Sequence, residues 1–248
     1  MGEPLRIAMW SGPRNISTAI MRAFENRADC AVSDEPFYAA YLAATGLVHP
    51  QRDEILASQP TDPAAVVAQV TGPAPGGRPL WYQKHMTHHM LPGFDRGWID
   101  GVANAFLIRA PEAVLLSYVE KRSAVTLDEI GLPQQVELFD RVADRLGRAP
   151  PVIESRDVLL DPRGALSALC AALNIPFDDA MLSWPPGRRD TDGVWAPSWY
   201  DGVERSTGFA PPGPERGFDD LPDRLKPLAE AGRPLYERLV RFSLPPRA

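Results

Sequence analysis

Residues 11–26, SGPRNISTAIMRAFEN, carry the strongest structural signal in the chain, because they connect an apolar run to an amphipathic one through a short polar turn. The apolar run, residues 5–10, has the composition of a strand buried on both faces, and residues 19–26 have that of a helix. A strand, a tight turn and a hydroxyl-rich helix start hold phosphate or sulfate on backbone N–H groups, at the positive end of the helix dipole. We therefore predict an anion site made by Ser11, Gly12, Pro13, Arg14, Asn15, Ile16, Ser17 and Thr18.

The side chains of this turn suit an anion better than a nucleoside triphosphate with magnesium. Arg14 adds a positive charge, and Ser17 and Thr18 add hydroxyl donors. The phosphate loop of nucleoside triphosphatases reads GxxxxGK[ST], in which Gly-Lys directly precedes the hydroxyl residue. Here Asn15 and Ile16 stand in that place, so the sequence does not match that loop.

The composition indicates a globular chain with one sizeable core. The chain has 248 residues, of which 44% are hydrophobic and 23% charged. Its net charge of −6 argues against a nucleic-acid-binding protein, so an anion site has to be a local cluster of arginines. Cys30 and Cys170 form neither a disulfide framework nor a metal-binding spacing, and we expect buried free thiols.

No segment is expected to direct the chain into a membrane. Residues 1–4 lead directly into the first predicted strand, which argues against a signal peptide. No apolar run approaches the about 18 residues of a membrane span. We expect a cytoplasmic protein whose partner is a small molecule, with no nucleic acid or membrane involved, and the sequence specifies no oligomeric state.

Short apolar segments alternate with amphipathic ones along the chain, which is typical of a parallel sheet covered by helices. Strands are predicted at residues 5–9, 31–33, 80–83, 105–108 and 152–154, and helices at 17–25, 65–70, 111–121, 133–146, 162–173 and 221–240. We predict a single α/β domain over residues 1–248, with three α/β/α layers, a central parallel sheet and the ligand at the carboxyl ends of the strands. The irregular residues 184–214 are a candidate lid.

The segment Pro13-Arg14-Asn15-Ile16-Ser17-Thr18 resembles the 5′-phosphosulfate loop of the sulfotransferases that use 3′-phosphoadenosine 5′-phosphosulfate (PAPS), commonly written P-[KR]-S-G-T-T. On this resemblance Arg14 takes the cationic position, and Ser17 and Thr18 take the hydroxyl positions. Asn15 and Ile16 depart from the usual Ser-Gly, and Ile16 adopts a positive φ angle less readily than glycine does. The resemblance implies a P-loop-type α/β/α fold and PAPS as the sulfuryl donor, with no metal ion.

A second segment, residues 106–118, resembles the 3′-phosphate site of the same family: a strand, then R-x-P, then a helix with a serine eight residues after the arginine. Arg109 leaves the strand end, and Ser117 lies about two helical turns into the following helix. A phosphate between them could receive charge from one and a hydroxyl bond from the other. The resemblance therefore implies that Arg109 and Ser117 bind the nucleotide.

Three further segments follow the order of the family. Residues 152–177 resemble its strand–helix unit, Y-E-D-L…D-P…L-x-x-x-L-G-[LI]-P-F, whose role is structural. Asp34-Glu35-Pro36-Phe37 resembles a Glu-Pro element of bacterial and carbohydrate sulfotransferases, in some of which a carboxylate is thought to take the acceptor proton. The mobile glycine-containing segment that closes over the nucleotide corresponds to Arg205, Ser206, Thr207 and Gly208.

The base that receives the acceptor's proton has two candidates. Glu35 follows the second predicted strand, near the expected mouth of the site. His85 stands beside Lys84 at the end of the third strand, where many family members place a catalytic lysine and histidine, although the commoner pattern is K-x-H. Together with His88 and His89, His85 could instead form a metal site on one helix face or line a cleft without catalysis, and we expect no metal.

The sequence thus predicts transfer of a sulfuryl group from PAPS to a hydroxyl or amine of a small acceptor, with Arg14 neutralising the bridging and leaving oxygens. A P-loop kinase or triphosphatase is an alternative, which the absent Gly-Lys opposes. A nucleotide-binding protein that has lost its chemistry is another, which the Asn15-Ile16 departure favours. Either a structural cluster or an aromatic acceptor pocket is expected from Trp184, Trp195, Trp199, Tyr200 and Phe209.

Overall fold

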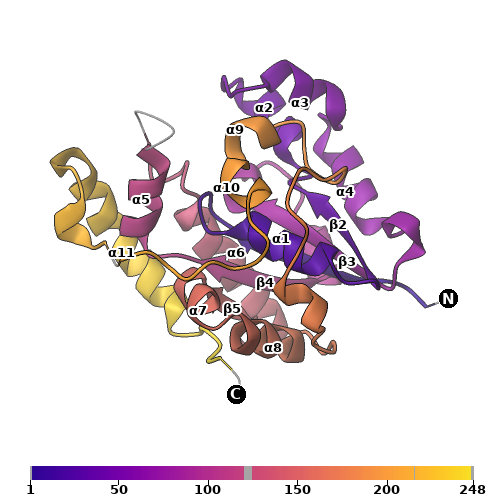
Figure 1. Ribbon diagram of the computed structural model, residues 1–248. Coiled ribbons are helices and arrows are strands. Elements are labelled where there is room, and N and C mark those ends of the chain that lie inside the picture. The colour runs from indigo at the N-terminus through magenta and orange to yellow at the C-terminus, as the bar shows by residue number, and fades with distance from the viewer. Residues whose placement is uncertain (1, 120–124, 215, 247–248) are drawn as a thin grey trace.

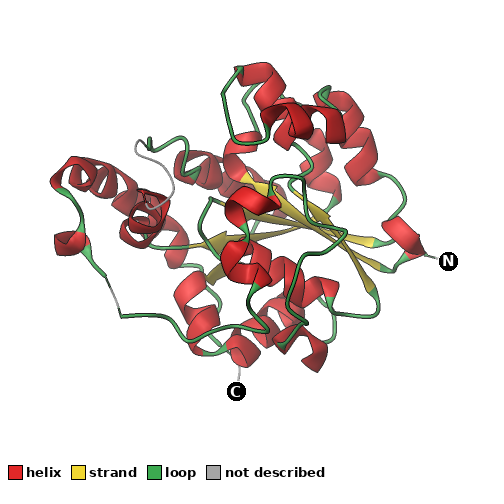
Figure 2. Ribbon diagram, turned by 45° about the horizontal axis from the view of Figure 1, so that its top comes forward, coloured by secondary structure: helices red, strands yellow, loops and turns green. Residues whose placement is uncertain are grey.

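The structure, a computed structural model, describes residues 2–119, 125–214 and 216–246. Five parallel strands form a central sheet in the order β2-β3-β1-β4-β5, with helices on both faces (Figures 1 and 2). The strands are β1 (Leu5–Ser11), β2 (Cys30–Asp34), β3 (Leu80–Met86), β4 (Ala103–Ile108) and β5 (Val152–Glu154). The predicted three-layer α/β/α fold with a central parallel sheet is confirmed.

The helices differ widely in length; some lie in the connections between strands, and others follow the last strand, β5. The α-helices are α1 (Ser17–Glu25), α2 (Tyr38–Thr45), α3 (Arg52–Ser58), α4 (Pro63–Thr71), α5 (Pro111–Val119), α6 (Leu132–Leu146), α7 (Ser155–Leu160), α8 (Pro162–Ala172), α9 (Ala196–Trp199), α10 (Asp201–Glu204) and α11 (Lys226–Val240). Short 3₁₀ helices are η1 (Pro75–Gly77), η2 (Thr87–His89), η3 (Gly97–Gly101), η4 (Asp179–Leu182), η5 (Phe218–Asp220) and η6 (Asp223–Leu225).

Strand β1 separates two hydrophobic cores, because its side chains alternate between the faces of the sheet. Ile7 and Met9 pack with α1 and α8 on one face. Ala8 and Trp10 pack with α6 and α11 on the other face. All four side chains are fully buried, as expected for the central strand of a parallel sheet covered on both sides.

A third, smaller cluster joins the helices after β2 to the irregular C-terminal segment. Tyr38 and Leu42 of α2 pack with Ile55 of α3 and with Trp195 and Tyr200, which flank α9. Figure 1 shows α2, α3 and α9 together at the top of the molecule, beyond the carboxyl end of β2. Residues far apart in the chain therefore meet at the edge of the sheet where a ligand is expected.

The sequence located the sheet and most long helices but missed the elements of this third cluster. All five strands lie where they were predicted, with bounds that differ by at most a few residues, and α1 matches its prediction. The helix predicted over residues 111–121 corresponds to α5, and its predicted end lies outside the described residues. Helices α2 and α3 were not predicted, because α2 is short and apolar on all sides and shows no helical period. Within the described ranges, no helix is both long and apolar enough to cross a membrane.

Candidate functional site

The loop between β1 and α1 has a strained backbone. Arg14 and Ile16 have φ angles of 62° and 58°, in the left-handed region. This conformation costs energy for any residue with a Cβ atom, most of all a β-branched one, and persists where the surrounding structure holds it. Gly12 fits for a different reason, since a Cβ atom there would lie 2.3 Å from the carbonyl oxygen of Ile130. The loop is thus packed tightly against a neighbouring backbone and strained next to the start of α1.

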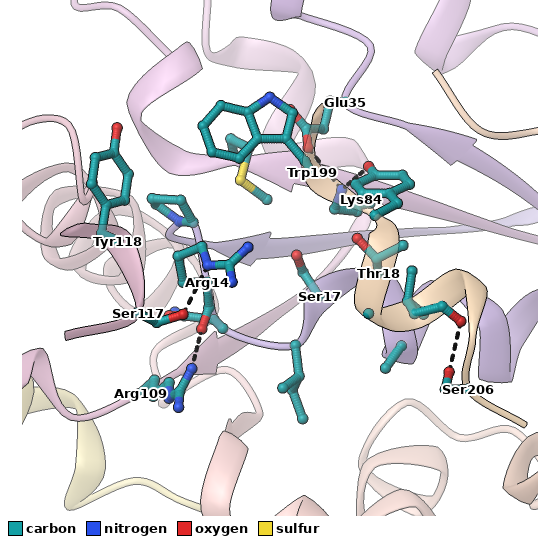
Figure 3. Close-up of a pocket in the computed structure, with 18 of the residues that line it drawn as sticks. Arg14, Ser17, Thr18, Glu35, Lys84, Arg109, Ser117, Tyr118, Trp199 and Ser206 are labelled. Atoms are coloured by element: carbon teal, nitrogen blue, oxygen red, sulfur yellow. Dashed lines mark hydrogen bonds and ion pairs between the residues drawn. The ribbon is translucent and has the colours of Figure 1, made fainter. Parts of the chain in front are cut away.

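Two arginines and a serine meet at this loop (Figure 3). Nε of Arg14 donates a hydrogen bond to Oγ of Ser117 over 2.9 Å, and Arg109 donates to the carbonyl oxygen of Arg14 over 2.6 Å. Arg109 follows β4 and Ser117 lies on α5, so two neighbouring strand ends meet here. The structure therefore brings together the two segments that the sequence assigned to one nucleotide site.

A cavity of about 450 Å³ lies beside the loop, a size typical of small-molecule sites. We call one part of it the arginine end, which is lined by Arg14, Ser17, Thr18, Arg109 and Ser117. We call the other part the lysine end, which is lined by Glu35, Tyr38, Lys84, His89 and Trp195. Pro13, Asn15 and Ile16 line the cavity as well, and the segment over residues 184–214 contributes Ser206 and Gly208.

Four of the predicted binding residues do not line this cavity. Ser11 is fully buried at the end of β1, and Gly12 packs against the backbone of Ile130. Arg205 and Thr207 are exposed to solvent, outside the cavity wall. Ser11 and Gly12 therefore shape the loop from behind, whereas only the serine and the glycine of the Arg205–Gly208 stretch reach the cavity.

Lys84 is the centre of a buried polar network at the lysine end. Its ammonium group donates to Oδ1 of Asp34 over 2.9 Å, to Oε1 of Glu35 over 2.7 Å and to the hydroxyl oxygen of Tyr200 over 2.6 Å. The Tyr200 hydroxyl in turn lies 2.7 Å from Oδ2 of Asp34 and accepts from Nε1 of Trp195 over 3.0 Å. Burial alone would lower the pKa of Lys84, but the two carboxylates outweigh it and raise that pKa well above 10.5.

Glu35 has the properties of a base that faces the cavity. Burial raises the pKa of its carboxyl group above the usual 4.5, although Lys84 opposes this effect. Its φ angle of 41° is unfavourable for a side chain of this kind, a sort of strain that clusters at functional sites. A carboxylate with a raised pKa accepts a proton more readily than an ordinary one, so this position suits proton abstraction.

His89 lies next to Glu35 and has an unsatisfied ring nitrogen. Its Nδ1 atom is 4.0 Å from Oε2 of Glu35 and has no hydrogen-bond partner among the described residues. The ring stacks against Tyr38 and Tyr41, with centroid distances of 4.5 and 4.7 Å, and burial holds its pKa well below 6.5. The ring is therefore neutral, and its Nδ1 atom is almost fully buried.

The structure does not bring His85, the other candidate base, to the cavity. Adjacent residues of a strand point to opposite faces, and β3 continues through both Lys84 and His85. The imidazole of His85 stacks on Trp10 at 4.7 Å, and its Nε2 lies 3.2 Å from Oε1 of Gln83. Burial lowers the pKa of His85 to about 3, so the ring is a neutral part of the core behind the sheet.

The histidine, cysteine and acidic side chains of the described residues are the candidates for metal and thiol chemistry. No group of three or more histidine, cysteine, aspartate or glutamate side chains there has the arrangement of a metal site. Cys30 and Cys170 are buried free thiols, as predicted. Burial raises the pKa of Cys30 to about 12 and that of Cys170 to about 11, so neither thiol is activated.

Sequence reasoning missed the partners that hold the lysine end together. Asp34 was noted only as the neighbour of Glu35, and Tyr200 only as one of several aromatic residues. No local pattern links residues 34, 84 and 200, since their contact depends on how the segment around α9 folds over the sheet. His89 was named only together with His85 and His88, as part of a metal site or of a cleft lining, and both His88 and His89 do line the cavity.

Comparison with known proteins identifies the family of this domain. A sequence model described as "Sulfotransferase domain" matches residues 5–240. Two Arabidopsis thaliana proteins, named branched-chain-amino-acid aminotransferase-like proteins 1 and 2, are 37% and 35% identical to the chain over 239 and 233 residues. These matches cover 96% and 94% of this chain but only 42% and 41% of the relatives, so the chain spans about two fifths of their length.

Solved structures share the fold at low sequence identity. The sulfotransferase domain of the Synechococcus PCC 7002 olefin synthase superposes with a TM-score of 0.55 at 18% identity, and covers 99% of this chain and 98% of its own. The sulfotransferase domain from the curacin biosynthetic pathway gives 0.56 at 16% identity, with 99% and 100% covered. A sulfotransferase from Alicyclobacillus acidocaldarius gives 0.52 at 13%, with 98% and 96% covered.

Proposed function

The chain belongs to the sulfotransferase family, and we propose that it transfers a sulfuryl group from PAPS to a hydroxyl or amine group of a small acceptor. One observation carries the proposal. A single cavity has a pair of arginines with hydroxyl groups at one end and a buried Lys84–Glu35 pair at the other. The arginines and hydroxyl groups suit a phosphosulfate, and the Lys84–Glu35 pair suits the deprotonation of an acceptor.

The arginine end fits a nucleotide with several anionic groups. Arg14, Ser17 and Thr18 hold the phosphosulfate, whose bridging oxygen gains negative charge as the bond to sulfur breaks. Arg109 and Ser117 hold the 3′-phosphate, and Ser206 and Gly208 border the same cavity. The strained, tightly packed loop between β1 and α1 supports this assignment, since it fixes Arg14 before any ligand arrives.

The lysine end fits the acceptor. Glu35 accepts the proton of the attacking group, and its raised pKa brings it closer to the working pH of such a base. Lys84 positions Glu35 through an ion pair of 2.7 Å. PAPS supplies the sulfuryl group, and the bisphosphate leaves with its charge neutralised by Arg14.

A thermal-shift titration tests the donor. The folded protein is titrated with 3′-phosphoadenosine 5′-phosphate, with ADP and with ATP–Mg. Because a ligand that binds only the folded state stabilises it by about 2.7 kcal/mol at one hundred times its Kd, the bisphosphate should raise the melting temperature clearly. Arg109→Ala should weaken that binding by about tenfold or more, since a charged hydrogen-bond donor is lost. A shift with ATP–Mg alone would instead favour a kinase.

A further inference from the structure

Two carboxylates follow one another at the end of β2, and their surroundings differ. Both oxygens of Asp34 accept hydrogen bonds: Nζ of Lys84 lies 2.9 Å from Oδ1, and the backbone N–H of Gly193 donates to Oδ2 over 3.1 Å. The hydroxyl oxygen of Tyr200 lies 2.9 and 2.7 Å from the same two atoms. The side chain of Asp34 is 1% exposed, and the residue does not line the cavity. Its oxygens are therefore engaged by protein donors rather than by a ligand.

The carboxylate of Glu35 lines the cavity and has fewer protein donors around it. Its Oε1 atom accepts from Lys84 over 2.7 Å. Its Oε2 atom lies 4.0 Å from Nδ1 of His89, which is beyond hydrogen-bond distance. Of the two neighbouring carboxylates, Glu35 is therefore the one placed to receive a proton from a bound molecule.

The hydroxyl group of Tyr200 connects the groups that separate these two roles. Its oxygen accepts from the ammonium group of Lys84 over 2.6 Å and from Nε1 of Trp195 over 3.0 Å. A phenol oxygen has two lone pairs, so these donors occupy both, and its own proton goes to the carboxylate of Asp34. Because Lys84 has three protons and gives one each to Asp34 and Tyr200, its third is directed to Glu35.

We infer that Tyr200 is a positioning residue for Glu35, the proposed base. The inference rests on the proposed function and adds a residue to that site. Tyr200 acts through Asp34 and Lys84: it holds Asp34 as the fixed counter-ion of the ammonium group, and Lys84 then holds Oε1 of Glu35. The segment that follows α9, far from β2 in the chain, thereby orients the carboxylate that takes the acceptor's proton.

Tyr200→Phe tests this role, because it keeps the ring that packs in the third cluster and removes only the hydroxyl group. The protein is labelled with glutamate carrying ¹³C at the carboxyl carbon, and the Glu35 signal, identified by its loss in Glu35→Gln, is followed by NMR as the pH is varied. The Tyr200 hydroxyl lowers the pKa of Glu35. Its loss should therefore move the titration midpoint to higher pH by about one pH unit, as expected when a hydrogen bond in a charged network is lost.

Asp34→Asn should move the same midpoint in the opposite direction. The negative charge of Asp34 raises the pKa of Glu35, and without it Glu35 becomes the sole counter-ion of Lys84. Two other titratable groups, His89 beside Glu35 and the half-buried His49 of the same cavity wall, are unchanged in both variants. A variant that only loosens the fold would admit water and move the midpoint toward the ordinary 4.5, so an upward shift in Tyr200→Phe has no such explanation.

Tyr82→Phe is the matched control. It removes another fully buried tyrosine hydroxyl, two residues before Lys84 on β3, which has no hydrogen-bond partner among the described residues. The Glu35 midpoint should stay at its wild-type pH in this variant. Binding of 3′-phosphoadenosine 5′-phosphate, measured by thermal shift, reports whether each variant is folded.

The outcomes separate this inference from the proposed function. A Glu35 midpoint that stays in place or falls in a folded Tyr200→Phe variant would overturn the role of Tyr200, and so would an upward shift in Asp34→Asn. If the bisphosphate binds to the wild-type chain in that case, the proposed function stands. If the bisphosphate does not bind to the wild-type chain, the proposed function fails, and the role of Tyr200 in it fails as well.

Discussion

At the arginine end of the cavity, Arg14 donates to the hydroxyl group of Ser117 and Arg109 donates to the backbone carbonyl of Arg14, and both arginines are half-buried. At the lysine end, Lys84 bonds to two carboxylates and a tyrosine hydroxyl, and all of these groups are buried. The first end is made by one continuous loop and one strand–helix junction. The second is assembled from the ends of β2 and β3 and from the segment around α9.

Because of this difference, we expect the two ends to contribute differently to ligand binding and to the stability of the fold. A half-buried charge beside a cavity can be removed with little loss of stability, because water can reach the groups that it contacted. A charge that neutralises two buried carboxylates cannot be removed so easily, since both would remain in a site with little water. Loss of the arginine end should therefore affect mainly ligand binding, whereas loss of the lysine end should affect the stability of the fold as well.

The largest expected effect is that of Lys84→Met, which keeps the length of the side chain and removes its charge. Asp34 and Glu35 would then lie unpaired in a buried site, and breaking such a pair costs about 3–5 kcal/mol. We expect the free energy of unfolding in urea to fall by that amount. The loss should be partly recovered at low pH, where the carboxyl groups become protonated.

Arg14→Met is the matched control for the lysine substitution. It removes one hydrogen bond to Ser117 and should lower the free energy of unfolding by about 1 kcal/mol. Sulfuryl transfer from PAPS should nevertheless fall by about 10²–10³-fold, as is typical when a donor to a developing anion is removed. Equal losses of stability in the two variants would contradict the distinction between the two ends.

The second effect is on the pH dependence of transfer. Glu35 must be ionised to accept a proton, so activity is present above its pKa and falls as pH decreases through it, by about tenfold per pH unit. Burial raises this pKa, against the effect of Lys84, so the acidic limb of kcat/KM should lie above pH 4.5. The groups that face Glu35 are Asp34, Lys84, Tyr200 and His89, and the apparent value belongs to this network as a whole.

Glu35→Gln is the control for the acidic limb. The amide has nearly the same size, cannot accept the proton and should leave a low residual rate that no longer falls in this pH range. His85→Gln should keep the limb of the wild-type chain, because that residue lies behind the sheet against Trp10. An acidic limb that persists in Glu35→Gln would remove Glu35 from the role of base.

The sequence predicted the arginine end better than the lysine end, for physical reasons. The residues from Pro13 to Thr18 are neighbours in the chain, and Arg109 with Ser117 are joined by one strand–helix junction, so local patterns place them. Strand alternation could have separated Lys84 from His85, had the strand been predicted to continue to Met86. The contact of Tyr200 with Asp34 depends on the packing of distant segments, which no local pattern reports.

The smallest expected effect concerns Ile16, where the chain departs from the glycine of the family pattern. Its φ angle of 58° favours glycine, while its half-buried side chain packs against the core beneath α1. Ile16→Ala and Ile16→Gly both lose that packing, but only glycine relieves the backbone strain. We therefore expect Ile16→Gly to be more stable than Ile16→Ala by about 1 kcal/mol in urea unfolding, although glycine is ordinarily the less stable of the two. The reverse order would mean that the loop relaxes in solution, and Arg14 would then not be fixed before the nucleotide binds.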